Sequence, residues 1–194
     1  MNHLIIYAHP SEKSFSNQLK EAIVAETIRQ GHTVIVRDLY EMNFNPVLSP
    51  MDLTLLKNGK TPEDIAIEQQ HLSDAQLVTF IFPLWWAGYP AIVKGYIDRV
   101  FSYGFAYKAG EDGKEGLLQN KKVVLFTSMG NSLEDYAKKD LLSAFEHTLG
   151  TEIFEFCGMT IAHHQFFPQI PDAQVDEKLR LVNDALRVYG VVMI

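Results

Sequence analysis

Short apolar runs alternate with longer amphipathic segments along this sequence, and that alternation restricts the fold more than any other feature. The runs are short enough to be buried strands; they are residues 4–8, 34–36, 77–82, 123–126 and 153–157. The segments between them carry apolar residues at helical spacing, most clearly in residues 15–30, 90–101, 133–149 and 176–189. Strands that alternate with helices form parallel βαβ units. We therefore expect one α/β domain over residues 1–194, a three-layer sandwich with a five-stranded parallel sheet.

Two stretches lack a clear period. Residues 38–60 contain two prolines and a glycine and are expected to form an extended loop. A helix is then expected to begin with Thr61 as its cap and Pro62 at its first position. Residues 108–122 are polar and contain three glycines, which is typical of a mobile surface loop.

Charge and composition disfavour several classes of protein. The formal net charge is -7, and the 17 Lys and Arg residues are scattered, which disfavours nucleic acid or an anionic membrane as a partner. No apolar run reaches the ~18 residues that would predict membrane insertion. The lone cysteine, Cys157, cannot form an internal disulfide, and the N-terminus has no basic flank before a long apolar stretch. We therefore expect a cytoplasmic protein.

Ligands of such sheets bind outside the carboxyl ends of the strands, which draws attention to three loops. The first, His9–Asn17, is rich in hydroxyl and amide groups and runs into a helix N-terminus. Unpaired N–H groups and the helix dipole can bind phosphate there. The alternative is that Ser14 or Ser16 only caps the helix, and the loop by itself leaves both interpretations open. The sequence lacks the glycine-rich patterns of dinucleotide-binding Rossmann sites and of P-loops.

The second loop, residues 82–90, has four aromatic residues (Phe82, Trp85, Trp86 and Tyr89), and it follows the most apolar run. A flat heterocycle needs aromatic walls and exposed backbone amides, which a loop between two prolines can supply. The alternative is that both tryptophans are core residues. The third loop, residues 127–132, is small and polar, and its glycine allows close backbone approach. The candidate cofactor-binding residues of the three loops are His9, Ser14, Phe15, Ser16, Asn17, Pro83, Leu84, Trp85, Trp86, Ala87, Thr127, Ser128, Met129, Gly130 and Asn131.

Several stretches resemble one known family. They are residues 4–9 (LIIYAH) with 14–15 (SF), 38–46 (DLYEMNFNP), 82–86 (FPLWW), 90–95 (PAIVKG), 98–101 (DRVF) and 105–107 (FAY). In these the chain is similar to the flavodoxin-like NAD(P)H:quinone oxidoreductases, which include the bacterial drug-activity modulators and the potassium-efflux ancillary proteins. The resemblance spans nearly the whole chain.

The resemblance implies a flavoprotein enzyme. His9, Ser14, Phe15 and Asn17 match residues that hold the flavin phosphate and ribityl chain, and residues 83–87 and 127–130 match backbone that contacts the isoalloxazine ring. It implies hydride transfer from NADH or NADPH to the flavin and then to a quinone-like acceptor in the same stacking site. It also implies a homodimer whose pocket is completed by residues 101–107 of the partner subunit. The match of residues 38–46 favours FAD, with FMN as the alternative.

The sequence departs from the family pattern at a few positions. Ser16 stands where the family usually has Asn, and the family's two-glycine loop is Met129–Gly130 here. The family places a Tyr beside the flavin to handle charge, and Tyr136 matches it after a one-residue shift. The family histidine six residues further on is replaced by Leu142.

The remaining histidines do not supply an obvious substitute. His147 lies 11 residues, or about three helical turns, beyond Tyr136, and a lone histidine late in a helix is more often structural. His163 and His164 look like a metal pair, but adjacent residues rarely converge on one ion and no carboxylate motif accompanies them. We therefore assign the charge-handling role to Tyr136 and predict no metal.

Two other functions are alternatives to the enzyme. One is a flavin-carrying regulatory or sensor subunit of another protein, as the channel-ancillary relatives suggest. The other is an electron-transfer flavodoxin, which is disfavoured because such proteins present an acidic docking face and do not bind nicotinamide.

Overall fold

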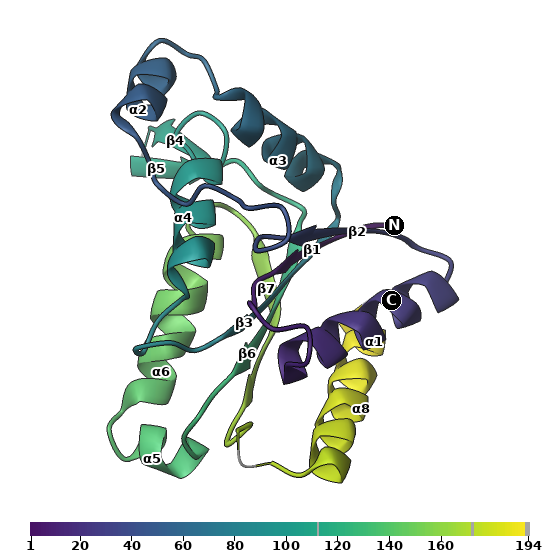
Figure 1. Cartoon of the computed structure of the whole chain (residues 1–194). Coiled ribbons are helices and arrows are strands. Elements are labelled where there is room, and N and C mark those ends of the chain that lie inside the picture. The colour runs from purple at the N-terminus through teal and green to yellow at the C-terminus, as the bar shows by residue number, and fades with distance from the viewer. Residues whose placement is uncertain (112, 172, 193–194) are drawn as a thin grey trace.

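The computed structural model shows a central sheet with helices on both faces (Figure 1). It describes residues 1–111, 113–171 and 173–192. The sheet has the order β2-β1-β3-β6-β7, and all neighbouring strands are parallel. Its strands are β1 (Asn2–Tyr7), β2 (Thr33–Asp38), β3 (Leu77–Pro83), β6 (Lys122–Ser128) and β7 (Thr160–Phe167). The predicted five-stranded parallel α/β sandwich is therefore confirmed.

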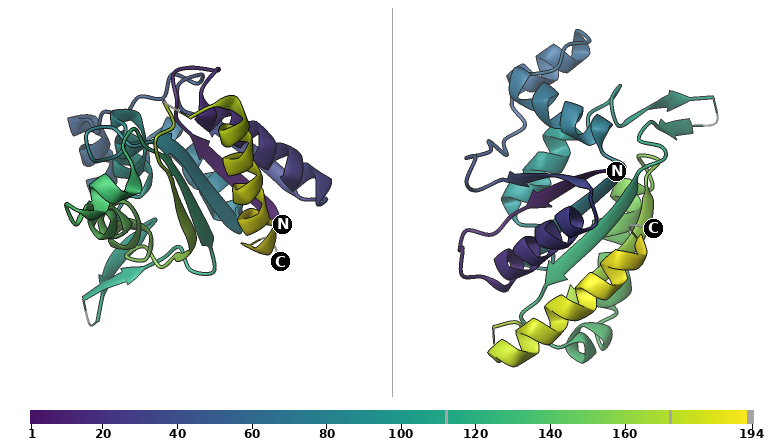
Figure 2. Two further views of the ribbon diagram at one scale, coloured as in Figure 1. Left: turned by 90° about the horizontal axis from the view of Figure 1, so that it is seen from below. Right: turned by 90° about the vertical axis from the view of Figure 1, so that its right-hand side faces the viewer.

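The helices form the two outer layers. On one face lie α1 (Phe15–Arg29) and α8 (Val175–Val192), and the opposite face is covered mainly by α3 (Glu63–Asp74), α4 (Ala91–Val100) and α6 (Leu141–Glu146) (Figure 2). Among the described residues, no helix has the length and apolar character that crossing a bilayer requires.

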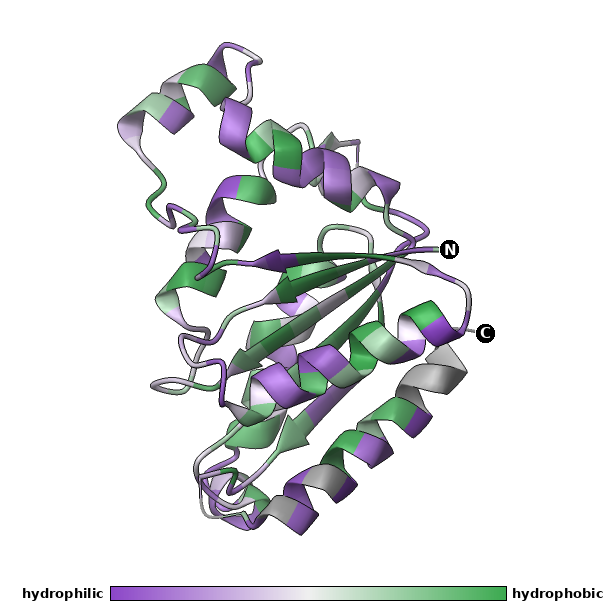
Figure 3. Cartoon of the chain, turned by 45° about the vertical axis from the view of Figure 1, so that its right-hand side comes forward, coloured by the Kyte–Doolittle hydropathy of each residue, from purple (hydrophilic) through white to green (hydrophobic). Residues whose placement is uncertain are grey.

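Alternate residues of the central strands pack into two separate cores. On β3, Phe80 packs toward the α4 face and Ile81 toward the α1 and α8 face, and both are at most 1% exposed. Strands covered on both faces are apolar throughout, which explains the continuous runs in the sequence. Figure 3 shows these strands as a hydrophobic layer between helices with polar outer surfaces.

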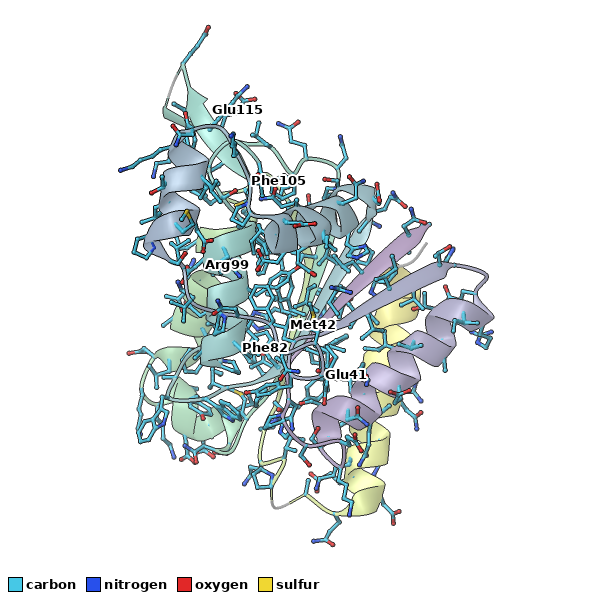
Figure 4. The ribbon with its side chains drawn as sticks, turned by 45° about the horizontal axis from the view of Figure 1, so that its top comes forward. Glu41, Met42, Phe82, Arg99, Phe105 and Glu115 are labelled. Atoms are coloured by element: carbon cyan, nitrogen blue, oxygen red, sulfur yellow. The ribbon has the colours of Figure 1, made fainter. Side chains whose placement is uncertain are left out.

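The expected loop over residues 38–60 contains a helix, α2 (Pro50–Lys57). Ser49 caps it in a capping box with Asp52, and Asp52 also binds the guanidinium group of Arg99, 5% exposed on α4. The next helix, α3, begins after Pro62 without a side-chain cap, so the prediction that Thr61 caps it was wrong. Asp64 of α3 binds the same Arg99. One buried arginine, labelled on α4 in Figure 4, thus joins three helices.

The expected mobile loop over residues 108–122 contains an antiparallel hairpin of β4 (Tyr107–Gly110) and β5 (Gly113–Gly116). Gly116 anchors its base, since a Cβ there would lie 2.3 Å from the backbone carbon of Cys157.

The predicted helix over residues 133–149 is interrupted. It comprises α5 (Leu133–Ala137), a left-handed Asp140 at φ 55°, α6, and a π-helical turn, η1 (His147–Thr151). The helix α7 (Glu152–Phe154) and a turn follow, so the predicted strand over residues 153–157 was wrong. The last strand is β7, which the apolar pattern did not predict because the residues at its centre are polar. As an edge strand with a bulge, β7 does not need a continuous apolar sequence.

Candidate functional site

The structure brings the three predicted loops together at the carboxyl edge of the sheet. The backbone N–H of Leu84 donates to the carbonyl of Ser128 at 2.7 Å, which joins the second loop to the third. The hydroxyl groups of Ser16 and Ser128 lie 3.3 Å apart, which joins the first loop to the third. The rings of His9 and Trp85 have centroids 6.5 Å apart, which places the first loop beside the second. One site can therefore draw on all three.

Ser14 fixes the start of α1. Its hydroxyl accepts the N–H of Asn17, so it does cap the helix. A cap satisfies only part of the first turn. Within the described chain, the N–H groups of Phe15 and Ser16 have no acceptor, and they stay available to a ligand. Capping and anion binding are thus compatible at this terminus.

His9 presents a defined face to the site. Its Nδ1 accepts the N–H of Ser11 at 3.0 Å, and burial lowers the pKa of its imidazole. A neutral ring that accepts at Nδ1 carries its proton on Nε2. His9 therefore offers one hydrogen-bond donor beside Trp85.

The second loop is a tight turn. Trp85 and Gly88 each donate to the other's carbonyl, at 3.1 and 3.0 Å, and the two residues between them have positive φ. Trp86 at 50° and Ala87 at 56° adopt a conformation that usually requires Asn or Gly. Such strain is often found at functional sites.

Both tryptophans lie outside the core. Trp86 is 103% exposed and Trp85 is 40% exposed. With Leu84 they line a hollow of ≈ 370 Å³ beside the turn. The interpretation of both as core residues is therefore excluded, and the turn supplies aromatic surface where the three loops meet.

Most of the third loop is held by its neighbours. Thr127 is fully buried, and the buried Met129 donates its N–H to Phe167 and accepts from Ile170. The carbonyl of Asn131 accepts from Gln169. Residues 167–170 therefore form a fourth segment of the site. The sequence did not reveal this segment, because the last strand, which it follows, was predicted at the wrong place.

Unpaired backbone donors characterise the site. No acceptor among the described residues takes up the N–H groups of Trp86, Ala87 or Gly130, in addition to those of Phe15 and Ser16. Preorganised amides of this kind suit a ligand with several acceptor atoms on a flat ring and an anionic group nearby.

Tyr136 and His147 occupy different surroundings. Tyr136 lies in α5, directly after the third loop, and its half-buried ring meets Phe145 edge-on at 5.4 Å. His147 is exposed at the start of η1, beyond the left-handed break at Asp140. The helix is interrupted between Tyr136 and His147, so the predicted separation of about three helical turns does not describe their positions.

His163 and His164 lie within β7, not after it, and face opposite sides of the sheet. His163 pairs with Val124 and His164 with Leu125, and these two belong to different cores. They cannot bind one ion together. In the described part of the chain, no three potential metal ligands (His, Cys, Asp or Glu) lie close enough together to hold an ion. Burial lowers the pKa of His164 to about 4, so its ring is neutral at pH 7.

A larger groove of ≈ 500 Å³ lies between the start of α1 and the end of β2, and His9 and Asn17 of the first loop line part of it. Four carboxylates line it, from Glu12, Glu21, Asp38 and Glu41, against a single lysine, Lys20. That charge repels phosphate, so volume alone does not identify the site.

The strand order and the loops at the carboxyl edge define the flavodoxin-like class of α/β proteins. The family model described as "Flavodoxin-like fold" matches residues 1–188. The chain is 42% identical over 181 residues to an "Uncharacterized NAD(P)H oxidoreductase" of Haemophilus influenzae, covering 93% of this chain and 89% of that protein. It is 35% identical to "NAD(P)H dehydrogenase [quinone] 1" of Rattus norvegicus, covering 89% and 72%.

A solved structure gives the same result. An NAD(P)H:quinone oxidoreductase from Methanothermobacter marburgensis superimposes with a TM-score of 0.85 at 29% identity, covering 96% of each chain. The chain thus belongs to the flavodoxin-like NAD(P)H:quinone oxidoreductase family.

Proposed function

We propose that this protein is a flavin-dependent enzyme that reduces quinone-like acceptors with NADH or NADPH. The observation that carries the proposal is the set of unpaired amides at Phe15, Ser16, Trp86, Ala87 and Gly130, all on loops that meet at one edge of the sheet. The family relationship agrees with this chemistry.

The residues fit a flavin in two respects. The first turn of α1, with the Nε2 donor of His9 nearby, suits the phosphate and ribityl chain. The amides of Ala87 and Gly130 suit the acceptor atoms of the ring, and the side chains of Trp85 and Trp86 offer apolar surface. We favour FAD over FMN, because the sequence of residues 38–46 resembles that of FAD-using members of the family.

A bound flavin supplies the hydride chemistry, accepting from the nicotinamide and donating to the quinone. The protein holds the ring and places N–H donors where negative charge develops. We assign to the phenol of Tyr136 a hydrogen bond at the same edge of the ring. A single stacking site beside Trp86 then serves donor and acceptor in turn, which makes the kinetics ping-pong.

The same site supports a homodimer. Trp86 is fully exposed, as is much of Tyr103 at 61%. A hollow of ≈ 260 Å³ is lined in part by Phe101, Tyr107 and Phe156. A second copy would cover these apolar groups and close the stacking site. We also propose a cytoplasmic location, in keeping with the lone, buried Cys157.

The test is cofactor binding by the purified protein. We expect a yellow protein whose released cofactor is identified by mass, and whose apoprotein quenches the fluorescence of added FAD. Replacing Tyr96 with Phe, which removes a buried hydroxyl bond to Glu68 on α4 away from the three loops, is the matched control and should leave the affinity unchanged. A colourless protein that gives no change with FAD or FMN contradicts the proposal.

A further inference from the structure

Two side chains, Tyr89 of the second loop and His164 of strand β7, converge on adjacent residues of the π-helical turn η1. The hydroxyl of Tyr89 donates to the carbonyl of Leu149. The Nδ1 atom of His164 faces Gly150, and a Cβ added to Gly150 would lie 3.9 Å from it. A π-helical turn shifts the backbone pairing, so its carbonyls can accept from side chains, and such turns occur frequently at functional sites.

Tyr89 connects η1 to the Trp85–Gly88 turn. It follows Gly88, the last residue of the strained turn, and its ring packs on Phe82 with centroids 4.6 Å apart. Burial raises the pKa of its hydroxyl, which therefore remains a donor at all physiological pH values. The bond to Leu149 fixes one end of a turn whose two central residues are in a costly conformation.

His164 connects the same region to the third loop. Its Nε2 lies 3.2 Å from the hydroxyl of Thr127, and its ring packs on Phe166 with centroids 4.1 Å apart. Its Nδ1 is buried and has no hydrogen-bond partner among the residues that the structure describes. An unpaired buried polar atom lowers stability, whereas an apolar side chain would avoid that loss. What the imidazole provides in return is the bond to Thr127, the residue at which the third loop begins.

We propose that Tyr89 and His164 are positioning residues for the flavin site. Both pack against η1, which thereby holds the Trp85–Gly88 turn and the third loop in a fixed position relative to each other. The amides of Ala87 and Gly130 belong to these two loops, so the geometry they offer a flavin depends on that support. This inference rests on the proposed function, but the tethering of the turn can be measured without flavin.

The first experiment uses the fact that the chain's 2 tryptophans are both in this turn. Tryptophan fluorescence anisotropy of the apoprotein, excited at the red edge to suppress energy transfer, reports on the turn alone. We expect Tyr89→Phe to lower it. The matched control is Tyr96→Phe, which also removes a buried hydroxyl bond, to Glu68, but on α4 away from the loops. It should lower thermal stability without changing the anisotropy.

The second experiment measures FAD affinity. We expect Tyr89→Phe and Thr127→Val each to weaken binding about tenfold. The double variant should lose less than the product of the two, because both act through one support. His164→Gln, which keeps a donor toward Thr127, should bind better than His164→Leu. His163→Gln, on the opposite face, should bind like the wild type.

The outcomes separate the two proposals. If the wild type binds FAD, but Tyr89→Phe changes neither anisotropy nor affinity beyond Tyr96→Phe, the inference is overturned and the proposed function stands. Strictly multiplicative losses also overturn it, since the two loops would then be independent. A wild type that binds no flavin overturns the proposed function, and with it any role for these residues in a flavin site.

Discussion

The hydroxyl groups of Ser16 and Ser128 lie 3.3 Å apart, although 112 positions separate them in the sequence. Ser16 stands in the first turn of α1 and Ser128 at the end of β6. The contact joins the proposed phosphate end of the site to the proposed ring end.

Removing either hydroxyl should therefore weaken flavin binding. We expect Ser16→Ala and Ser128→Ala each to raise the Kd about five- to tenfold, close to 1 kcal/mol for a lost hydrogen bond. A double-mutant cycle measured by flavin fluorescence should show coupling between them. Additive losses would mean that the two hydroxyls act separately.

Substitutions of Tyr136 and of His147 should affect the rate of flavin reduction differently. Tyr136 lies in α5, the helix that follows the third loop, whereas His147 is exposed beyond the break at Asp140. We expect Tyr136→Phe to slow bleaching of the flavin by NADPH about tenfold, or about 1.4 kcal/mol, and His147→Ala to leave it nearly unchanged. Stopped-flow absorbance decides between them, and a larger loss for His147→Ala would reassign the role.

The sequence carried enough information to predict the sheet and the three loops. The buried strands β1, β3 and β6 are apolar on both faces, so their runs were unambiguous, and the loops follow directly from their ends. The last strand was misplaced because β7 is an edge strand with His163, His164 and Gln165 at its centre. The apolar residues of α7 were predicted to form a strand, because a short apolar run does not distinguish a buried strand from a short helix.

Tertiary contacts account for what the sequence could not reveal. The bond from Tyr89 to Leu149 and the pair of His164 and Thr127 join residues 60 and 37 positions apart, on elements whose pairing depends on the correct last strand. The strained Trp86–Ala87 pair carries no glycine or asparagine signal. Its turn is imposed by its surroundings.

Gly95 allows α4 to approach the segment before α2 closely. A Cβ at this position would lie 2.2 Å from the carbonyl oxygen of Pro46 and 2.3 Å from its Cβ. We expect Gly95→Ala to lower the free energy of unfolding by about 1–3 kcal/mol, measured by urea denaturation. In Gly130→Ala the added Cβ meets nothing within 4 Å, and the change should stay within about 0.5 kcal/mol. Equal losses would contradict the close approach.

Buried His3 should make stability depend on pH. Its two ring nitrogens bond to Thr27 and Thr79, and burial, with a smaller contribution from the charge of His32, lowers its pKa to about 3. The unfolded chain has an ordinary value near 6.5, so between about pH 6.5 and 3 it binds more protons than the folded protein, and stability falls as pH falls. From pH 7 to 5 this histidine should cost about 2 kcal/mol.

Urea unfolding at pH 7 and pH 5 tests this expectation. His3→Asn should be less stable than the wild type at pH 7 but should lose less on acidification. His147→Asn, at an exposed position, should keep the wild-type pH dependence. An unchanged pH dependence in His3→Asn would show that other groups control acid stability.

The most direct test of the proposed enzyme is anaerobic double-mixing stopped flow on the flavin-loaded protein. NADPH, added in an amount equal to the flavin, is mixed first, and a naphthoquinone is added after the nicotinamide is consumed. We predict rapid loss of the oxidised flavin absorbance, then its full return on the second mix, at rates that account for steady-state turnover. Flavin that NADPH and NADH both fail to bleach, or reduced flavin that no quinone reoxidises, would contradict the account.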